Sequence, residues 1–303
     1  MNKKQIAIVG TGGVGGYFGF KINEANKHNE YTITFVARGV TYDILSTKGL
    51  TLLSSEHPNA VTKPNRVVED IAHLDVPDLV LICVKEYDLE NVCRQLSRVI
   101  SPDTILLPMM NGADIYDRIR KILPGNTILP SCVYVASHIK EKGIVEHKGK
   151  PGKLIAGRDP QNFDRDIDWA LALIENSGID FDFKDNSLAD IWTKFIFIAS
   201  FGLVTAKHNS SIGSVCADEL QRNEATNIME EIRLIAAGKN ILLEEDIIAK
   251  TFAKAATFPP QTPTSLQLDV NSRKENNELE LFAGAIINYG LELNIDVSNT
   301  QRI

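Results

Sequence analysis

The sequence predicts an α/β domain followed by an all-helical domain, because its apolar patterns change character partway along the chain. Short apolar runs alternate with helical patterns up to about Lys184, and long helical patterns alone follow. Alternating strands and helices are typical of a parallel sheet with crossover helices. The 303 residues are enough for two domains with their own cores. We therefore divide the chain near Asp185 into residues 1–184 and 185–303, with a cleft between the two domains.

The α/β part is predicted from compact apolar runs. Strands are expected at Gln5–Val9, Tyr31–Ala37, Leu79–Val84 and Thr104–Pro108, and helices at Val14–Ala25, Leu89–Ile100 and Ala113–Leu123. The stretch Thr127–Gly157 is rich in Val, Ile and Gly, which favours antiparallel strands. A helix at Phe163–Asn176 and a strand at Ile179–Phe183 complete this part.

The second part shows only helical patterns. Helices are expected at Ser187–Ser200, Ala217–Ala237, Glu245–Thr257 and Glu278–Leu293. In the second of these, Ile228, Ile232 and Ile235 recur on one face, which is amphipathic spacing. Gly238 supplies a C-terminal stop for that helix. Three prolines within Phe258–Pro263 indicate a loop.

Composition excludes several classes of protein. The formal net charge of −7 and the lack of a basic run argue against nucleic-acid binding. The four cysteines form no C-x-x-C pair and no His/Cys cluster has metal spacing, so we expect no metal and reduced thiols in the cytoplasm. No apolar run has the length of a membrane span, and the N-terminus lacks a signal-peptide pattern. The expected partner is a small molecule, bound by a monomer or a homodimer.

A glycine loop follows the first predicted strand. Gly10, Thr11, Gly12, Gly13, Val14 and Gly15 match G-x-G-x-x-G. Here the pattern follows a strand and opens a helix, which is the context of a Rossmann-type dinucleotide site. The first glycine permits the tight turn, the second allows close approach of the pyrophosphate, and the third allows close packing of helix on strand. The alternative is a flexible loop that binds no ligand.

Charged and polar residues at the ends of later strands indicate which dinucleotide binds. The second strand ends at Arg38 and not at a carboxylate, which favours the 2′-phosphate of NADPH over the free hydroxyl of NADH. Lys85 and Asn111 follow two further strands, at the edge where parallel sheets bind ligands. Each residue also has an interpretation without a ligand: Arg38 as a solvated arginine, Lys85 as a surface lysine, and Asn111-Gly112 as a turn.

Lys194 is the only charge in the apolar segment Ile191–Ala199. Burying an ammonium is costly unless it is paired or its pKa falls, and such a lysine can serve as a general acid. The alternative is a lysine that reaches the surface from a buried helix. Glu278 and Glu280 begin the last long helix, where they either favour the helix dipole or reach the active site.

Together these features resemble the ketopantoate reductase (2-dehydropantoate 2-reductase) family along nearly the whole chain. The resemblance includes the glycine loop, Arg38, Val84-Lys85, Asn111-Gly112, Trp192-x-Lys194, Thr205-Ala206, Ser265-x-x-x-Asp269 and Glu278. It implies NADPH-dependent reduction of a 2-oxo acid, with ketopantoate converted to (R)-pantoate for pantothenate biosynthesis.

The resemblance also implies roles for single residues. Lys194 would be the catalytic acid, and Ser265 would hydrogen-bond the substrate. Asn111 would contact the nicotinamide end of the cofactor and the substrate. Arg38 and Lys85 would lie near the 2′-phosphate. Glu278 would help to hold the cofactor and the catalytic lysine.

The sequence departs from the family pattern around the substrate. Family asparagines one and two turns after the lysine are replaced by Ile198 and Gly202, and a third by Ile212. Asn277 is a rival for the place of Glu278, and the family pattern has one more helix where this chain ends. The alternatives are therefore a reductase of a more apolar 2-oxo acid, a 3-hydroxy acid dehydrogenase, or a non-catalytic NADP(H)-binding protein.

Overall fold

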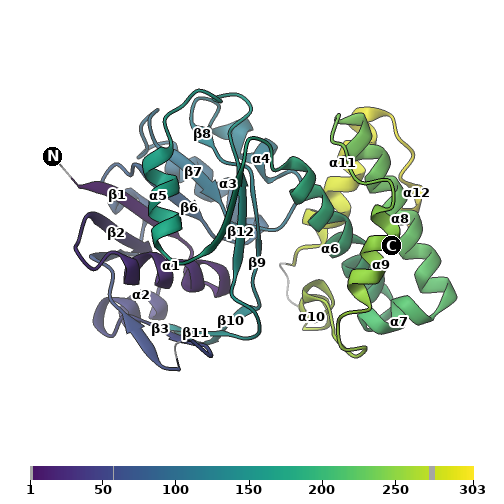
Figure 1. The fold of residues 1–303 in the computed structure, drawn as a ribbon, viewed down its shortest axis with the longest axis horizontal. Coiled ribbons are helices and arrows are strands. Elements are labelled where there is room, and N and C mark those ends of the chain that lie inside the picture. Colours follow the sequence, from purple (N-terminus) through teal and green to yellow (C-terminus); the bar gives the residue numbers. More distant parts are fainter. Residues whose placement is uncertain (1–2, 57, 273–276) are drawn as a thin grey trace. The chain divides into compact units, whose positions relative to one another are not determined.

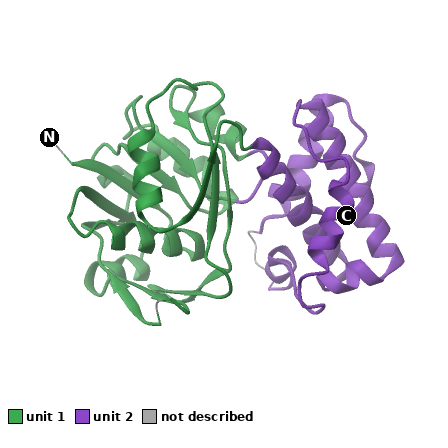
Figure 2. Cartoon of the chain, in the orientation of Figure 1, with its two compact units in different colours: residues 1–110, 115–187 green, residues 111–114, 188–303 purple. Residues whose placement is uncertain are grey.

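The computed structural model describes residues 3–56, 58–272 and 277–303 and forms two compact units. The first comprises residues 1–110 and 115–187, and the second comprises residues 111–114 and 188–303 (Figure 2). The chain therefore changes unit after Met110, after Asp114 and after Ser187.

A parallel six-stranded sheet forms the centre of the first unit (Figure 1). Its order is β5 (Arg66–Val68), β2 (Tyr31–Val36), β1 (Lys4–Val9), β6 (Leu79–Ile82), β7 (Ile105–Pro108) and β8 (Thr127–Ile128). The chain moves outward from β1 in both directions, so the order reverses between β1 and β6. Ligands of open α/β sheets bind at such a reversal. The prediction of a parallel sheet is confirmed.

Crossover helices accompany this sheet. They are α1 (Gly13–Ala25), α2 (Val40–Thr47), the 3₁₀ turn η1 (Ile71–His73), α3 (Glu86–Leu96), α4 (Ile115–Ile122) and α5 (Asp168–Asn176). Helix α5 begins five residues later than predicted, at Asp168 and not at Phe163. Tyr17, Phe18 and Phe20 of α1 are buried against the strands in the main core.

Two smaller sheets complete the first unit. One has the order β10 (Ser137–Glu141), β11 (Ile144–His147), β3 (Leu50–Leu53) and β4 (Ala60–Thr62), and the other β13 (Asp180–Lys184), β12 (Lys153–Gly157) and β9 (Ser131–Tyr134). The antiparallel prediction for Thr127–Gly157 holds for β10 with β11 and for β12 with β9. The other pairings of this stretch are parallel, since β8 joins β7, β11 joins β3 and β12 joins β13.

A buried ion pair links α4 to the end of β12. Arg120 donates to the Asp159 carboxylate, which also accepts the backbone N–H of Ile128 at 2.8 Å and the Tyr116 hydroxyl at 2.7 Å. Burial raises the pKa of Asp159, but the hydrogen bonds from Ile128, Tyr116, Gln161 and Asn162 outweigh this effect and leave that pKa below its ordinary value. The same burial and the Asp159 hydrogen bond raise the pKa of Tyr116 to about 12.

Among its described residues, the second unit is helical throughout. Its elements are α6 (Leu188–His208), α7 (Ile212–Ala217), α8 (Glu219–Gly238), α9 (Ile247–Ala255), α10 (Ser265–Asn271), the π-helical turn η2 (Glu280–Gly284), α11 (Ala285–Leu293) and α12 (Ser298–Gln301). The predicted all-helical character is confirmed. Helix α8 begins after Asp218, whose side chain accepts the Gln221 N–H. It continues one residue beyond the predicted Ala237, so that Gly238 lies within the helix and Lys239 is the C-cap.

Helix α6 is longer than predicted, because it continues from Ser200 to His208. At 21 residues it is long and apolar enough to cross a membrane, the only such helix among the described residues, although 67% of its most apolar window is buried. Trp192, Phe195 and Phe201 are all nearly inaccessible to solvent. This is the pattern of a central core helix.

Candidate functional site

The glycine loop connects β1 to α1, and each glycine occupies a different environment. Gly10 has φ +93°, and a Cβ there would lie 2.7 Å from the Cys83 carbonyl oxygen. A Cβ at Gly15 would lie 2.0 Å from the Gly10 oxygen, so this glycine permits close packing of helix on loop. At Gly12 a Cβ would meet no atom of the chain within 4 Å. The open side of the loop is therefore at Gly12.

The start of α1 is suited to an anion. Gly12 is the N-cap, no side chain caps the helix, and the first turn contains no acidic residue. Backbone N–H groups and the positive end of the helix dipole remain at this end of α1. Such a helix start binds phosphate groups.

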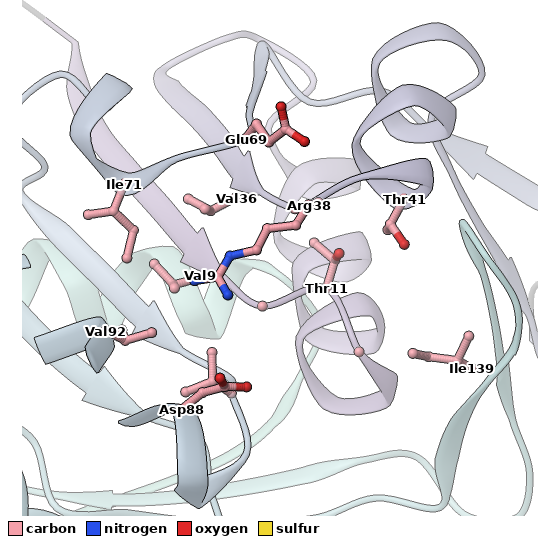
Figure 3. Close-up of a pocket in the computed structure, with 14 residues that line it drawn as sticks. Val9, Thr11, Val36, Arg38, Thr41, Glu69, Ile71, Asp88, Val92 and Ile139 are labelled. Atoms are coloured by element: carbon pink, nitrogen blue, oxygen red, sulfur yellow. The ribbon is translucent and has the colours of Figure 1, made fainter. Parts of the chain in front are cut away.

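A cavity of about 220 Å³ lies beside this loop in the first unit (Figure 3). It is many times the roughly 10–15 Å³ that is needed to hold one water molecule. Its walls come mainly from the carboxyl ends of neighbouring strands. They comprise Val9, Gly10, Thr11, Gly12, Val36, Ala37, Arg38, Thr41, Glu69, Ile71, Val84, Asp88, Val92 and Ile139. An aliphatic floor with a few polar groups is typical of a ligand site.

Three charged side chains line this cavity. Arg38 follows β2 and extends across it (Figure 3). Glu69 follows β5, and Asp88 lies in the first turn of α3. Lys85 is the exposed N-cap of α3, next in the chain to the lining residue Val84, but is not itself among the lining residues.

Sequence patterns did not reveal several of these walls. Glu69 and Ile71 follow β5, a three-residue strand that the apolar pattern does not show. Ile139 belongs to β10, in a different sheet from the glycine loop. A carboxylate directly after the apolar pair Val67-Val68 was the one available signal for Glu69.

Lys194 and Asn111 meet in the second unit. Lys194 lies on α6 and is 8% exposed, and its Nζ donates a 2.7 Å hydrogen bond to Asn111 Oδ1. Aromatic packing surrounds this part of α6: Trp192 contacts Tyr289, and Phe195 contacts Phe282 edge-on. These contacts fix the helix that carries the ammonium, and Asn111 fixes the direction of the ammonium.

Two further predicted residues lie in the same unit. Glu278 is 4% exposed and its backbone oxygen accepts the N–H of Phe282 at 3.3 Å. Its rival Asn277 accepts the Leu279 N–H at 3.0 Å and thereby caps the turn. Ser265 is the first residue of α10 and is exposed. The next residue in the chain, Leu266, lies close to Gly202 of α6.

Neither thiolate nor metal chemistry is indicated by the described residues. No three of their His, Cys, Asp or Glu side chains gather in metal-binding geometry. Burial raises the pKa of Cys83 and of Cys93 to about 12, so both thiols remain protonated near neutral pH.

The parallel sheet and the glycine loop are those of a dinucleotide-binding domain. Residues 6–161 match the family described as ketopantoate reductase PanE/ApbA, and residues 186–303 match the C-terminal part of that family. The chain therefore belongs to the ketopantoate reductase family and is an oxidoreductase.

Individual relatives are distant in sequence but match nearly the whole chain. A 2-dehydropantoate 2-reductase from a Nostoc species is 21% identical over 302 residues, which are 98% of this chain and 92% of the relative. The structure of a PanE/ApbA family ketopantoate reductase from Ralstonia eutropha is 23% identical, with a TM-score of 0.86 over 98% of this chain and 95% of that one. A D-mandelate dehydrogenase in a ternary structure with NADH and anilino(oxo)acetate is 18% identical, with a TM-score of 0.83 over 98% and 95% of the two chains.

Proposed function

We propose that this protein reduces a 2-oxo acid with NADPH, and that ketopantoate, reduced to (R)-pantoate, is its substrate. The observation that carries the proposal is the hydrogen bond between Lys194 Nζ and Asn111 Oδ1, which orients a buried ammonium. An ammonium held in a fixed direction can stabilise the negative charge that develops on a carbonyl oxygen during its reduction.

The residues beside the glycine loop fit NADPH. The open side of Gly12 and the uncapped start of α1 would receive the pyrophosphate. Arg38 would pair with the 2′-phosphate, and Lys85 would add positive charge nearby. When bound, NADPH supplies the hydride that adds to the ketone carbon.

Lys194 would supply the proton of the same reaction. As the ketone becomes an alkoxide, the ammonium stabilises the developing charge and then transfers a proton to that oxygen. An ammonium has three N–H donors, so the bond to Asn111 orients it and is compatible with donation to a substrate. Lys194 regains its proton from solvent. Ser265 would hydrogen-bond the substrate, and Glu278 would help to hold the cofactor and the lysine.

One observation favours a second candidate, a more apolar 2-oxo acid. Ile198 and Gly202 follow Lys194 by one and two turns of α6. A Cβ at Gly202 would lie 3.5 Å from Phe282 Cε2 and 3.6 Å from Leu266 Cβ. This stretch of α6 therefore offers a substrate hydroxyl no side-chain partner at either position.

The first experiment measures NADPH oxidation with ketopantoate by the wild type and by Lys194→Ala. Loss of a general acid lowers kcat by about 10²- to 10⁴-fold. Lys207→Ala, in the last turn of the same helix, is the control and should retain activity. Equal rates for wild type and Lys194→Ala would refute the assignment of the acid, and NADPH binding without turnover of any 2-oxo acid would refute the reaction.

A matched pair of substrates separates the two candidates. Ketopantoate and 3,3-dimethyl-2-oxobutanoate differ by a single hydroxyl group. A site that bonds this hydroxyl rejects the deoxy compound by roughly 10⁴-fold, whereas an apolar site discriminates by only about 10²-fold or less. Sedimentation of the same preparation distinguishes monomer from homodimer, and fractionation of cells tests the proposed cytoplasmic location.

A further inference from the structure

The turn that carries Arg38 is attached on one side to strand β5 and on the other to Glu69, the residue that follows β5. The backbone N–H of Ala37 donates to the Val68 carbonyl at 3.1 Å, which extends the parallel ladder one residue beyond β2. The N–H of Gly39 donates to Glu69 Oε1 at 3.0 Å. Arg38 is therefore the single residue between two anchored neighbours.

The conformation of Gly39 makes the second anchor important. Gly39 has φ +53° and ψ −137°, and it is the N-cap of α2, where its oxygen accepts the Asp43 N–H at 3.2 Å. Glycine reaches such backbone angles easily but also has many other conformations available. A charged acceptor on its N–H selects one of them.

The Arg38 side chain is not engaged by the two carboxylates of the cavity. Arg38 is exposed, and within the described residues its guanidinium has no ion pair, although Glu69 and Asp88 line the same cavity. Figure 3 shows the side chain extending across the cavity, away from the Glu69 carboxylate. Glu69 thus bonds the backbone beside Arg38 and leaves the guanidinium to a ligand.

We propose that Glu69 is a positioning residue for recognition of the 2′-phosphate: by binding the Gly39 N–H it holds the Arg38 turn in the conformation that presents the guanidinium to that phosphate. The proposal rests on the proposed use of NADPH. Glu69 touches no phosphate in this role.

Two effects of Glu69 on a phosphate have opposite signs. Its hydrogen bond orders the turn and favours binding, whereas its negative charge repels the phosphate. The carboxylate is exposed, so solvent and salt screen the repulsion. The backbone order does not depend on salt. The positioning effect should therefore dominate, and the two effects can be separated by substitution.

The test is calorimetric titration with two nucleotides that differ by the 2′-phosphate, adenosine 2′,5′-bisphosphate and adenosine 5′-monophosphate. In Glu69→Ala the Kd for the bisphosphate should rise about fivefold, as expected from partial release of one backbone residue. The Kd for the monophosphate should stay the same. Glu69→Gln keeps an acceptor oxygen and removes the charge, so it should bind the bisphosphate at least as tightly as wild type.

Two further variants control for structural damage. Asp166 also accepts one backbone N–H with an exposed carboxylate, at 3.2 Å from Asp168 N, but lies outside the cavity. Asp166→Ala should leave both titrations unchanged. Gly39→Ala perturbs the same turn through the donor of the hydrogen bond to Glu69, because alanine is strained at φ +53°. Combined with Glu69→Ala it should weaken bisphosphate binding less than the sum of the two single effects.

Three results would overturn the inference. They are an equal loss of affinity for both nucleotides in Glu69→Ala, the same loss in Glu69→Gln, and a wild type that does not distinguish the nucleotides. None of these titrations uses a 2-oxo acid. A failure of the reductase assay with a normal binding pattern would thus refute the proposed reaction and leave the role of Glu69 standing.

Discussion

Gly12 and Gly15 lie three residues apart in one loop, yet their substitution by alanine should have opposite consequences. At Gly15 the new methyl group would lie 2.0 Å from the Gly10 oxygen and 2.7 Å from Cys83 Cβ. The oxygen belongs to the backbone of a turn with positive φ, and the Gly10 N–H is bonded to Val36 O at 3.3 Å. Relief of this clash requires movement of the loop against the sheet. At Gly12 the methyl group would meet no atom of the chain.

The expected magnitudes follow from these contacts. Overpacking typically destabilises a protein by about 1–3 kcal/mol, and a clash with the backbone belongs at the upper end of this range. Replacement of a helical glycine by alanine offsets part of this cost, because alanine stabilises a helix by about 0.5–1 kcal/mol relative to glycine. Gly15→Ala should therefore lower the free energy of unfolding by about 2 kcal/mol and Tm by about 4–8 °C. Gly12→Ala loses only an N-cap preference of about 1 kcal/mol or less. Its methyl group, however, occupies the side of the loop where the pyrophosphate would bind.

Thermal unfolding and NADPH titration of the same samples test this contrast. Gly12→Ala should unfold close to the wild-type Tm and bind NADPH about tenfold more weakly or worse, since even small displacements of phosphate from N–H groups are costly. Gly125 also has open space around its Cβ position but lies outside the cavity, so Gly125→Ala is the matched control. The reasoning would be refuted if Gly12→Ala lowered Tm as much as Gly15→Ala, or if it bound NADPH normally.

Three more predictions concern single side chains. Arg38→Ala should raise the KM for NADPH about tenfold and change that for NADH by less than about twofold, since one exposed charge-assisted contact is lost; equal changes for both cofactors would contradict it. Asn111→Ala should lower kcat about tenfold, because Lys194 loses an orienting acceptor at 2.7 Å; an unchanged kcat would remove Asn111 from the mechanism. The pKa of Asp159 is depressed in the folded state, so its stabilisation is present at neutral pH and lost as the pH falls through the folded pKa. Asp159→Asn should cost about 3 kcal/mol at neutral pH, as measured by denaturant unfolding, and should flatten the loss of stability in acid.

The main sheet was predictable because its strands are buried on both faces. Residues Leu79–Ile82 and Ile105–Pro108 are all buried, and such strands appear in the sequence as continuous apolar runs. The four-stranded sheet was not predicted in detail, since β3 and β4 are short and half-exposed and β3 pairs with the distant β11. Short elements such as α2 and α10 were missed because they contain too few turns to show a period.

The candidate site was predictable where one residue type is tied to one backbone requirement. The glycine loop and the isolated charge of Lys194 stand out against their neighbours. The contact of Asn111 with Lys194 joins residues 83 positions apart, and nothing local in the sequence indicates it. Glu69 was missed for a related reason: its contact with the Gly39 N–H depends on the pairing of β5 with β2, which sets Val36 beside Val68.

The assignment of residues 111–114 to the helical unit limits how this protein can be taken apart or recombined. A single cut after Ser187 would yield a C-terminal fragment without Asn111, so Lys194 would lose a hydrogen-bond acceptor that the N-terminal fragment had kept. A chimera that exchanges only residues 188–303 with a relative would likewise combine one parent's lysine with the other parent's asparagine. Exchange of the complete helical unit therefore requires residues 111–114 to be transferred together with residues 188–303, which one break in the gene cannot achieve.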